Sequence, residues 1–537
     1  MSEKKSISRR SFLKTAAVAG AATAGSGLLG GFVPGLKPGI VSAQNVNWDR
    51  EVDVVVVGSG TGQMAAIRAA ANGLSVLVLE KAAVGGGTTG ISGGGIWMPN
   101  NFRMAEAGVP DSREEAIEYL SHATFGQSRP ELIEAFVDNC NVMLDFARSV
   151  GIDWVFLPMF NDYYPEFPGG KPQGRTLMPI STIEGASSGG ALVRMMQQAA
   201  EQLGAEYLFS TTARRLVVDD SGAVVGVIAE REGGAINIRA RRGVVLATGG
   251  FDHNPEMVTA FLRGPLYYPS AVRGCTGDGQ LMAMALGANM ANMNESWGWP
   301  VYFNETGGFS QPALTLDLGK PGCIVVNRRG VRFFNEAGNY DSATRTFYTY
   351  HNGTHEYVNI PGFAIIDSSH RSRYGFAGVP AGQDVPDWIK QAGSLAELAA
   401  MLEIDAEALQ ATVDRFNEFA VQGLDPDFNR GVSAFDQLTG GDRQRTDIIN
   451  PCLGPVSEPP FYAARLWPGS LGTCGGAVTN ARAQVINVWG EVIPGLYAVG
   501  NASASPMGAG YPGGGATVGA GMTFAYLAAE GMTNNRS

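Results

Sequence analysis

The stretch Asp53-Val54-Val55-Val56-Val57-Gly58-Ser59-Gly60-Thr61-Gly62 decides the fold of this chain. Its four consecutive valines predict a strand that is buried on both faces, as in a parallel sheet. The glycines permit a tight turn into a predicted helix over Met64–Asn72, and a second predicted strand, Ser75–Leu79, ends at Glu80. In such a βαβ unit the helix N-terminus faces a pyrophosphate and the acid receives ribose hydroxyls. The sequence therefore predicts a dinucleotide site here, although Gln63 stands where a third glycine is usual.

Four later segments extend this predicted site. The glycine-dense run Gly85–Gly95 is suited to contact a phosphate and a ring. The run Gly243–Gly250 is typical of a buried strand that ends in a glycine turn, and Thr276–Gly279 begins a helical run. Finally, Pro494–Asn501 returns a strand to the same sheet. Because more than 400 residues separate the first and last of these strands, the cofactor fold must enclose an insertion.

The predicted fold class is α/β with an α+β insertion, in which a Rossmann-like cofactor-binding domain is interrupted by a substrate-capping catalytic domain. Residues 48–296 and 471–537 are the predicted two parts of the cofactor-binding domain, and 297–470 are the insertion. Within the insertion the patterns predict two strands and one amphipathic helical stretch: Gly322–Asn327, Gly362–Ile366 and Leu395–Gln422.

Residues 1–43 have the pattern of a twin-arginine signal peptide. The segment Ser8-Arg9-Arg10-Ser11-Phe12-Leu13-Lys14 precedes a weakly apolar run, Thr15–Leu36, and Val41-Ser42-Ala43 offers small residues for cleavage. Export by this route predicts a periplasmic protein that folds around its cofactor in the cytoplasm. The alternative is an uncleaved membrane anchor, since the run is long enough to span but poor in Leu, Ile and Phe. No integral membrane segment is predicted after the signal.

Charge and cysteine content exclude several classes of function. Removing residues 1–43 takes away six basic groups and one acid, so a net charge of −11 becomes −16, which disfavours binding to nucleic acid or anionic membranes. Five scattered cysteines without a Cys-x-x-Cys pair predict neither a disulfide framework nor a c-type haem. The close pair His351 and His355 lacks further ligands, so no metal site is predicted.

A second glycine-dense loop, Gly510–Gly519, precedes the apolar run Met522–Ala529. Such a loop brings backbone amides and a helix N-terminus against a ligand. Within it, Tyr511 is a large side chain with a polar tip that the loop itself does not require. We expect the loop to close over the reactive end of a flavin. The side chain that it offers there is the phenol of Tyr511 rather than an arginine, and this difference narrows the class of substrate.

With these motifs in order, the chain resembles the 3-ketosteroid Δ1-dehydrogenases, within the fumarate reductase/succinate dehydrogenase flavoprotein superfamily. The resemblance covers essentially all of the chain after the signal. It rests on Gly58–Glu80, Gly86–Pro99, Asn335-Glu336 with Tyr340-Asp341, Phe461–Arg465, Leu471–Thr473 and Tyr511–Gly519. It implies FAD as the cofactor, and we expect non-covalent binding because segment 85–95 has no histidine for a covalent link.

The resemblance also implies the catalytic residues. The family's first active-site tyrosine falls on Tyr163, its general-base tyrosine on Tyr340, and its carbonyl-binding tyrosine and amide on Tyr511 and Gly515. Tyr340 would act as a phenolate that Tyr163 stabilises, and Tyr511 with the Gly515 N–H would hold the enolate oxygen of a 3-ketosteroid during 1,2-desaturation. The loop departs from the steroid pattern at Gly514, where a proline is common.

The motifs and the resemblance together predict a set of cofactor-binding residues. These are Gly58, Gly60, Gly62, Glu80, Lys81, Gly87, Thr88, Thr89, Ser92, Gly93, Gly94, Ala247, Gly249, Asp278, Gly500, Asn501, Thr517 and Val518.

Three other functions stay open from the sequence. One is a 4,5-desaturating ketosteroid dehydrogenase. Another is a periplasmic flavin-dependent ene-reductase for an unsaturated acid, which the absence of an arginine in 510–519 and the Thr473-Cys474 pair in place of His-Thr disfavour. The third is a non-catalytic flavin carrier. A flavin dehydrogenase also needs an external electron acceptor, a quinone or redox protein, which the sequence does not identify.

Overall fold

The computed structural model describes residues 40–304, 309–313 and 315–534. Most of the predicted signal peptide, residues 1–39, therefore lies outside the described residues. Val41–Ser42, which the sequence assigned to the end of the signal, form strand β1 and pair in parallel with β8 (Thr212–Val218). Among the described residues, no helix is both long enough and apolar enough to cross a membrane.

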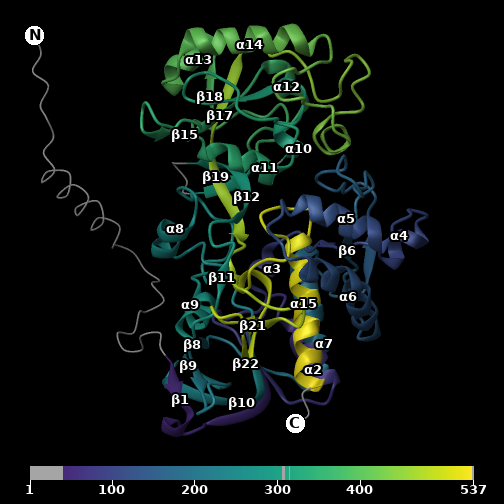
Figure 1. The fold of residues 1–537 in the computed structure, drawn as a ribbon. Coiled ribbons are helices and arrows are strands. Elements are labelled where there is room, and N and C mark those ends of the chain that lie inside the picture. Colours follow the sequence, from purple (N-terminus) through teal and green to yellow (C-terminus); the bar gives the residue numbers. More distant parts are fainter. Residues whose placement is uncertain (1–39, 305–308, 314, 535–537) are drawn as a thin grey trace, which may run out of the picture. The chain divides into compact units, whose positions relative to one another are not determined.

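A nine-stranded sheet, counted over the described residues, carries the predicted cofactor-binding motifs (Figure 1). Besides β1 and β8 its strands are β2 (Arg50–Val57), β3 (Val76–Leu79), β7 (Glu206–Leu208), β9 (Val224–Arg231), β10 (Gly234–Leu246), β21 (Gln484–Ile486) and β22 (Val492–Ala498). Strands β7, β3, β2, β10 and β22 run parallel to their neighbours in that order, and β8, β9 and β10 form an antiparallel meander. The predicted Rossmann-like fold class is confirmed, including the return of the C-terminal strand to this sheet.

Helices and strands cover both faces of this sheet. The nearest helices are α2 (Gln63–Ala71), α7 (Ser188–Gln202), α9 (Asp278–Ala285) and α15 (Ala516–Asn534). Val54 and Val56 share a core with α2, α7 and α15, whereas Val55 and Val57 share a core with β8, β9 and α9. This alternation is the burial on both faces that four consecutive valines predicted. Figure 1 also shows α15 beside α2, although the two helices come from opposite ends of the chain.

A smaller layer packs outside α2 and α15 in the first half of the chain. It comprises α3 (Gly87–Ile91), α4 (Phe102–Glu106), α5 (Arg113–Ala123), α6 (Pro130–Ser149) and a three-stranded sheet of β4 (Ile96–Trp97), β5 (Trp154–Phe156) and β6 (Thr176–Pro179).

The turn after β2 needs glycine for steric reasons. Gly58 has φ +107°, and a Cβ there would lie 2.3 Å from the carbonyl oxygen of Ala247 on the neighbouring strand connection. A Cβ on Gly62 would lie 2.4 Å from the Ala247 side chain. Gln63 fills the place of the third glycine with a buried side chain, whose Oε1 accepts from the Tyr207 hydroxyl at 2.8 Å. The first motif and the 247 turn are therefore in direct contact.

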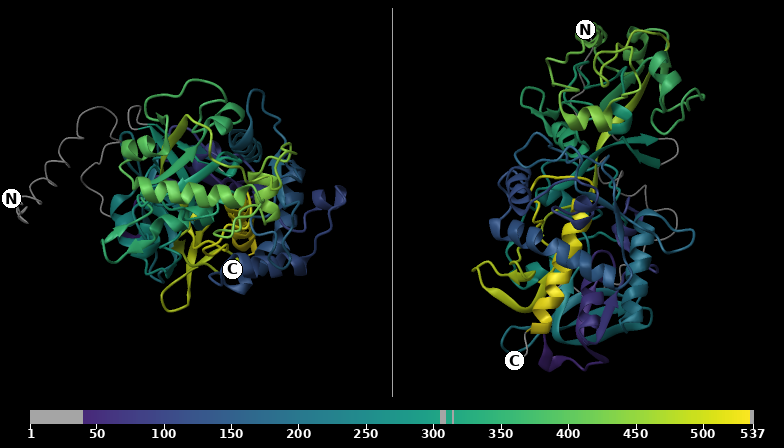
Figure 2. Two further views of the ribbon diagram at one scale, coloured as in Figure 1. Left: turned by 90° about the horizontal axis from the view of Figure 1, so that it is seen from above. Right: turned by 90° about the vertical axis from the view of Figure 1, so that its right-hand side faces the viewer.

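A six-stranded sheet, again counted over the described residues, forms the centre of the predicted insertion. It contains β12 (Ser296–Asn304), β13 (Phe309–Pro312), β14 (Cys323–Val326), β17 (Gly362–Ile366), β18 (Lys390–Ala392) and β19 (Phe461–Thr473). Its helices are α10 (Thr315–Leu318), α11 (Tyr340–Arg345), α12 (Ser368–Arg373), α13 (Leu395–Leu402) and α14 (Ala406–Ala420). In Figure 2 these green segments gather at one end, away from the purple strands of the large sheet.

The predicted elements of the insertion are present, with one difference. The two predicted strands appear as β14 and β17, but the single helical stretch 395–422 is two helices, α13 and α14. The helix ends because Glu403 adopts φ +58°, and Asp405 then caps α14 by accepting from the Ala408 N–H. The predicted boundary at 296/297 falls at the start of β12 and that at 470/471 inside β19, so the domain division stays a prediction.

The insertion is held together by a buried group of four charges. Glu336 accepts from Arg332 at 2.6 Å and from Arg430 at 3.1 Å, and Arg332 also pairs with Asp425 at 2.9 Å. Each of the four side chains is at most 4% exposed. Burial pushes the pKa of the Glu336 carboxyl up, but the two guanidiniums outweigh burial and hold that pKa below its ordinary value. The group is neutral as a whole, so removing one member leaves buried charge without a partner.

We predict that Glu336→Ala lowers the free energy of unfolding by about 3–5 kcal/mol, because two buried guanidiniums lose their carboxylate. The control is Asp427→Ala, which removes the partner of Arg415 in an ion pair whose side chains are 36% and 53% exposed. The control should cost less than about 1 kcal/mol. Guanidinium-induced unfolding of the FAD-loaded protein, followed by circular dichroism, measures both. Equal losses in the two variants would contradict the stabilising role of the buried group.

Candidate active site

The predicted cofactor motifs meet at one edge of the large sheet. Strands β2, β3, β10 and β22 all end there, and they are followed by Gly58, Glu80, Ala247 and Gly500. Hydrogen bonds join consecutive strand ends: the Gly58 N–H donates to the Leu79 carbonyl at 2.8 Å, and the Ala247 N–H donates to the Val57 carbonyl at 2.8 Å. In open α/β sheets ligands bind at this carboxyl edge.

Two features beside these strand ends would suit a bound dinucleotide. A Cβ added at Gly87 or Gly93 would meet no atom within 4 Å, so both glycines border open space next to the first turn. Gln280 is fully buried, and its amide nitrogen donates to the Gly249 and Asn501 carbonyls. Its Oε1, also buried, has no hydrogen-bond partner among the described residues. An unpartnered buried acceptor at the meeting point of two predicted cofactor motifs is what a ligand with N–H or O–H donors would satisfy.

Three charged residues of the predicted site lie near the end of β3. The Glu80 carboxylate accepts from the Ser59 N–H at 3.1 Å and from the Ser59 hydroxyl at 2.5 Å, which ties it to the first turn. Lys81 pairs with Asp278 at 2.9 Å and donates to the Thr276 hydroxyl at 2.7 Å. The structure thus brings Lys81 and Asp278 together across two segments that the sequence treated separately. Contact of these residues with the cofactor stays a prediction.

Several residues of segment 85–95 have partners within the protein. Thr88 accepts from the Val272 N–H at 3.2 Å, and Ser92 donates to the Thr89 carbonyl at 2.8 Å. A Cβ on Gly94 would lie 2.5 Å from the Ser188 backbone, so this glycine allows α7 to approach. A Cβ on Gly60 would lie 3.2 Å from the Thr89 hydroxyl, which places the segment against the first turn. Their predicted contacts with phosphate are additional to these roles and stay predictions.

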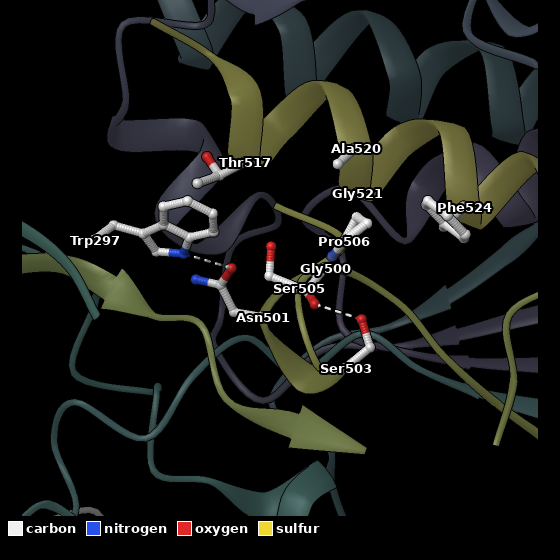
Figure 3. Close-up of a pocket in the computed structure, with 10 residues that line it drawn as sticks. All are labelled: Trp297, Gly500, Asn501, Ser503, Ser505, Pro506, Thr517, Ala520, Gly521 and Phe524. Carbon is white, nitrogen blue, oxygen red and sulfur yellow. Dashed lines mark hydrogen bonds between the residues drawn. The ribbon is translucent and has the colours of Figure 1, made fainter. Parts of the chain in front are cut away.

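The C-terminal motifs line a pocket between η4 (Gly500–Ala502) and α15 (Figure 3). Asn501 and Thr517 point into it, and Ala520 and Gly521 form its α15 wall. Val518, the other residue of this helix predicted to bind the cofactor, is 7% exposed. Trp297 on β12 borders the same pocket, and its indole N–H donates to Asn501 Oδ1 at 3.4 Å. The sequence missed Trp297, for which no local pattern gave a signal.

The three predicted catalytic tyrosines lie together. The Tyr163 hydroxyl donates to the Tyr340 hydroxyl at 2.7 Å, and the Tyr511 hydroxyl is close enough to influence the pKa of Tyr340. Ring centroids are 5.3 Å apart for Tyr163–Tyr340 and for Tyr163–Tyr511, and 5.7 Å apart for Tyr340–Tyr511. The adjacent Tyr164 points elsewhere, toward Ser342 at 3.2 Å. Of the adjacent pair, it is therefore Tyr163, the predicted residue, that lies beside Tyr340 and Tyr511.

Burial makes each of these phenols hard to ionise. It raises the pKa of Tyr340 well above the ordinary value, and the neighbouring hydroxyls of Tyr163 and Tyr511 add to that rise. Burial likewise raises the pKa of Tyr163 well above, and that of Tyr511 above, the ordinary value. At neutral pH the three hydroxyls are thus protonated and satisfy one another.

Gly515 places its backbone N–H beside Tyr511. Gly515 immediately precedes the first residue of α15, and its backbone amide offsets part of the rise in the pKa of Tyr511. It adopts φ +94°, and a Cβ would lie 2.4 Å from the Gly95 carbonyl, so both its conformation and its surroundings require glycine. One hydroxyl and one backbone amide at a helix N-terminus therefore lie close together.

A buried ion group that the sequence missed anchors this loop. Asp162 and Arg175 are fully buried and form an ion pair, and Asp162 Oδ1 accepts from the Trp97 indole N–H at 2.8 Å. The Asp162 backbone forms a β-bridge with Gly513, and the Tyr163 N–H donates to the Pro512 carbonyl at 2.9 Å. The segment carrying Tyr163 is thus tied directly to the segment carrying Tyr511. Phe435, also missed, packs on Tyr163 with ring centroids 5.2 Å apart.

Family models match this chain over the predicted cofactor-binding fold and over the predicted signal. A family model described as an FAD binding domain matches residues 53–518, and one described as a TAT (twin-arginine translocation) pathway signal sequence matches residues 6–26. The second match supports the predicted export by the twin-arginine route.

Relatives of known activity match over most of their length. The chain is 37% identical to a 3-oxosteroid 1-dehydrogenase of Mycobacterium tuberculosis (strain ATCC 25618 / H37Rv), covering 89% of this chain and 98% of the relative. It is also 37% identical to a 4-oxocyclohexanecarboxylate 2-dehydrogenase of Sinomonas cyclohexanicum, covering 89% and 92%. Its structure resembles that of 3-ketosteroid Δ1-dehydrogenase from Sterolibacterium denitrificans in complex with 1,4-androstadiene-3,17-dione, with a TM-score of 0.85 and 30% identity over 90% of this chain and 99% of the other.

Together with the glycine turns at the carboxyl edge of the sheet, these matches confirm the predicted cofactor. The chain belongs to the FAD-binding flavoprotein family that includes the 3-ketosteroid Δ1-dehydrogenases, and it is an FAD-dependent oxidoreductase.

Proposed function

We propose that this protein removes two hydrogens from a 3-ketosteroid and introduces the 1,2 double bond. The observation that carries the proposal is the proximity of Tyr340 and Tyr511, whose ring centroids are 5.7 Å apart and whose hydroxyls affect each other's pKa, with the Gly515 amide close to the Tyr511 hydroxyl. In a ketone, the carbon that loses a proton is bonded directly to the carbonyl carbon. A base and a carbonyl-oxygen donor that serve one ketone must therefore be neighbours, as these two hydroxyls are.

Each residue then has one task. Ionised Tyr340 takes the proton from C2, and the Tyr163 hydroxyl, 2.7 Å away, donates to the Tyr340 oxygen. The Tyr511 hydroxyl and the Gly515 N–H donate to the carbonyl oxygen as negative charge develops on it, and the N-terminus of α15 adds positive potential. Bound FAD supplies the acceptor for the hydride that leaves C1. Loss of one proton and one hydride from adjacent carbons leaves the double bond.

The relatives also point to a second class of ring ketone, a cyclohexanone that bears a carboxylate. Such a substrate needs a cation, and Arg345 is the basic residue of the helix that carries Tyr340. Its guanidinium is already paired with Glu295 at 2.9 Å and with Asp341 at 3.1 Å. This supports an uncharged ketone such as a steroid over a carboxylated one. We further propose that the exported protein works in the periplasm with an external electron acceptor.

The substrate is tested by anaerobic reduction of the bound flavin. We predict that a 3-ketosteroid bleaches the yellow colour, whereas 4-oxocyclohexanecarboxylate at the same concentration does so at least about tenfold more slowly, because Arg345 on the helix of Tyr340 is already paired with two carboxylates. Mass spectrometry and NMR of the product should locate the new double bond between C1 and C2. A bond between C4 and C5, or faster reduction by the carboxylate, would contradict the proposal. A reduced flavin that fumarate-type acids reoxidise rapidly would favour the ene-reductase.

The second prediction concerns the base. Tyr340→Phe should lower the rate of flavin reduction by at least about a hundredfold, because water replaces a positioned base poorly in a closed apolar site. FAD content and steroid binding should stay unchanged, since a phenyl ring keeps the packing volume. Tyr163→Phe is the matched control: it removes an equivalent hydroxyl that only assists, so its loss should be smaller. A Tyr340→Phe protein that reduces its flavin within a few-fold of wild type would show that Tyr340 only packs.

The third prediction is the pH dependence. Because burial raises the pKa of Tyr340 above its ordinary value, the ionised fraction at neutral pH is small and grows about tenfold for each pH unit below that pKa. The kcat/KM should therefore rise with pH from neutral into the alkaline range and level off only near the pKa. Steady-state rates across this range, with FAD retention checked at each pH, measure the effect. A profile that is flat through the neutral range would be incompatible with a tyrosinate base.

A further inference from the structure

Arg345 contacts three segments that surround the tyrosines. It is the last residue of α11, whose first residue is Tyr340. Its Nε donates to Asp341 Oδ2 at 3.1 Å, one Nη donates to Glu295 Oε2 at 2.9 Å, and the other Nη donates to the Ala509 carbonyl. One side chain thus joins the helix of the base, the approach to β12 and the C-terminal loop.

Each acceptor is close to a residue of the proposed site. Asp341 directly follows Tyr340, and its other oxygen accepts from the Gly298 N–H at 2.9 Å. Glu295 lies two residues before Trp297, whose ring packs on Tyr511 with centroids 5.0 Å apart. Ala509 lies two residues before Tyr511. The guanidinium therefore holds the base from one side and the carbonyl-binding tyrosine from the other.

Charge explains why a cation is needed between Asp341 and Glu295. Asp341 and Glu295 are 1% and 2% exposed, so both carboxylates need a fixed cation. A guanidinium is planar and presents its donors in a fixed fork, which lets one residue satisfy three acceptors in different directions. Arg263 also pairs with Glu295, but its side chain is 50% exposed and it comes from the segment after α8 (Pro255–Phe261).

We infer that Arg345 is a positioning residue of the proposed desaturation: its guanidinium sets the separation between the Tyr340 hydroxyl and the Tyr511–Gly515 donors. The inference rests on the proposed function, since this separation matters only if one ketone engages both groups. The base and the oxygen donor come from segments far apart in the chain, and Arg345 bridges them. A misplacement of about 1 Å can cost on the order of a hundredfold in rate.

The test is Arg345→Ala with chemical rescue. The rate of flavin reduction by saturating 3-ketosteroid, per bound FAD, should fall about tenfold to a hundredfold, while the steroid dissociation constant changes far less. Because the Arg345 side chain is 31% exposed, guanidinium ion can enter from solution and should restore part of the rate. Methylammonium carries the same charge without the fork and should restore less. Arg263→Ala, the matched control, should stay within about threefold of wild type.

Arg345→Lys covers the case in which the alanine variant does not retain FAD. Lysine keeps the charge but cannot reach all three acceptors, so the variant should hold FAD and still reduce it more slowly. Either variant reducing its flavin within about twofold of wild type would overturn the inference. Equal rescue by both cations would overturn it as well, because only charge would then be needed. A wild-type flavin that no ketone reduces would instead overturn the proposed function.

Discussion

The close approach of the C-terminal loop to strand β4 is the constraint on which the site depends. A Cβ at Gly515 would lie 2.4 Å from the Gly95 carbonyl, and one at Gly513 would lie 2.4 Å from the Trp97 indole. Only bare backbone fits at either place. Because the loop lies against this strand, Tyr511 is 4% exposed and packs on Tyr163 and Tyr340 rather than facing solvent.

The sequence predicted the fold better than it predicted the site. Four valines before a glycine turn allow only a buried parallel strand, so β2 and its neighbours followed from local pattern, and β17 has the predicted bounds. The break between α13 and α14 was missed because it depends on one left-handed residue, Glu403, which is not a residue type that favours that conformation. The predicted boundary at 470/471 falls inside β19 because this strand continues to Thr473 in order to pair with β12, a long-range pairing that local sequence does not reveal.

Local sequence patterns predict the site less well than the fold, because the residues of the site are far apart in the chain. Tyr163, Tyr340 and Tyr511 have nothing in common locally, and 16 tyrosines offered many other choices. Only the resemblance selected them, and the structure then brought their hydroxyls together. The buried Asp162–Arg175 pair had no such guide: an acid before a tyrosine and an arginine after a glycine are ordinary sequence. Its importance comes from complete burial, which depends on the whole fold.

The proposed base at Tyr340 has two opposing requirements: a pKa near the working pH, and a buried position that excludes water. A base works best with a pKa near the working pH, yet the burial that excludes water from the reacting carbons raises the pKa of Tyr340. No free cation of α11 stabilises the proposed base, because the guanidinium of Arg345 is paired with Glu295 and Asp341. The hydroxyl of Tyr163 donates to Tyr340 instead. With only neutral donors beside it, the Tyr340 phenol stays mostly protonated at neutral pH. In the proposed reaction different donors, the Tyr511 hydroxyl and the Gly515 N–H, act on the enolate oxygen, where charge develops only during the reaction, so they favour the transition state over the resting enzyme.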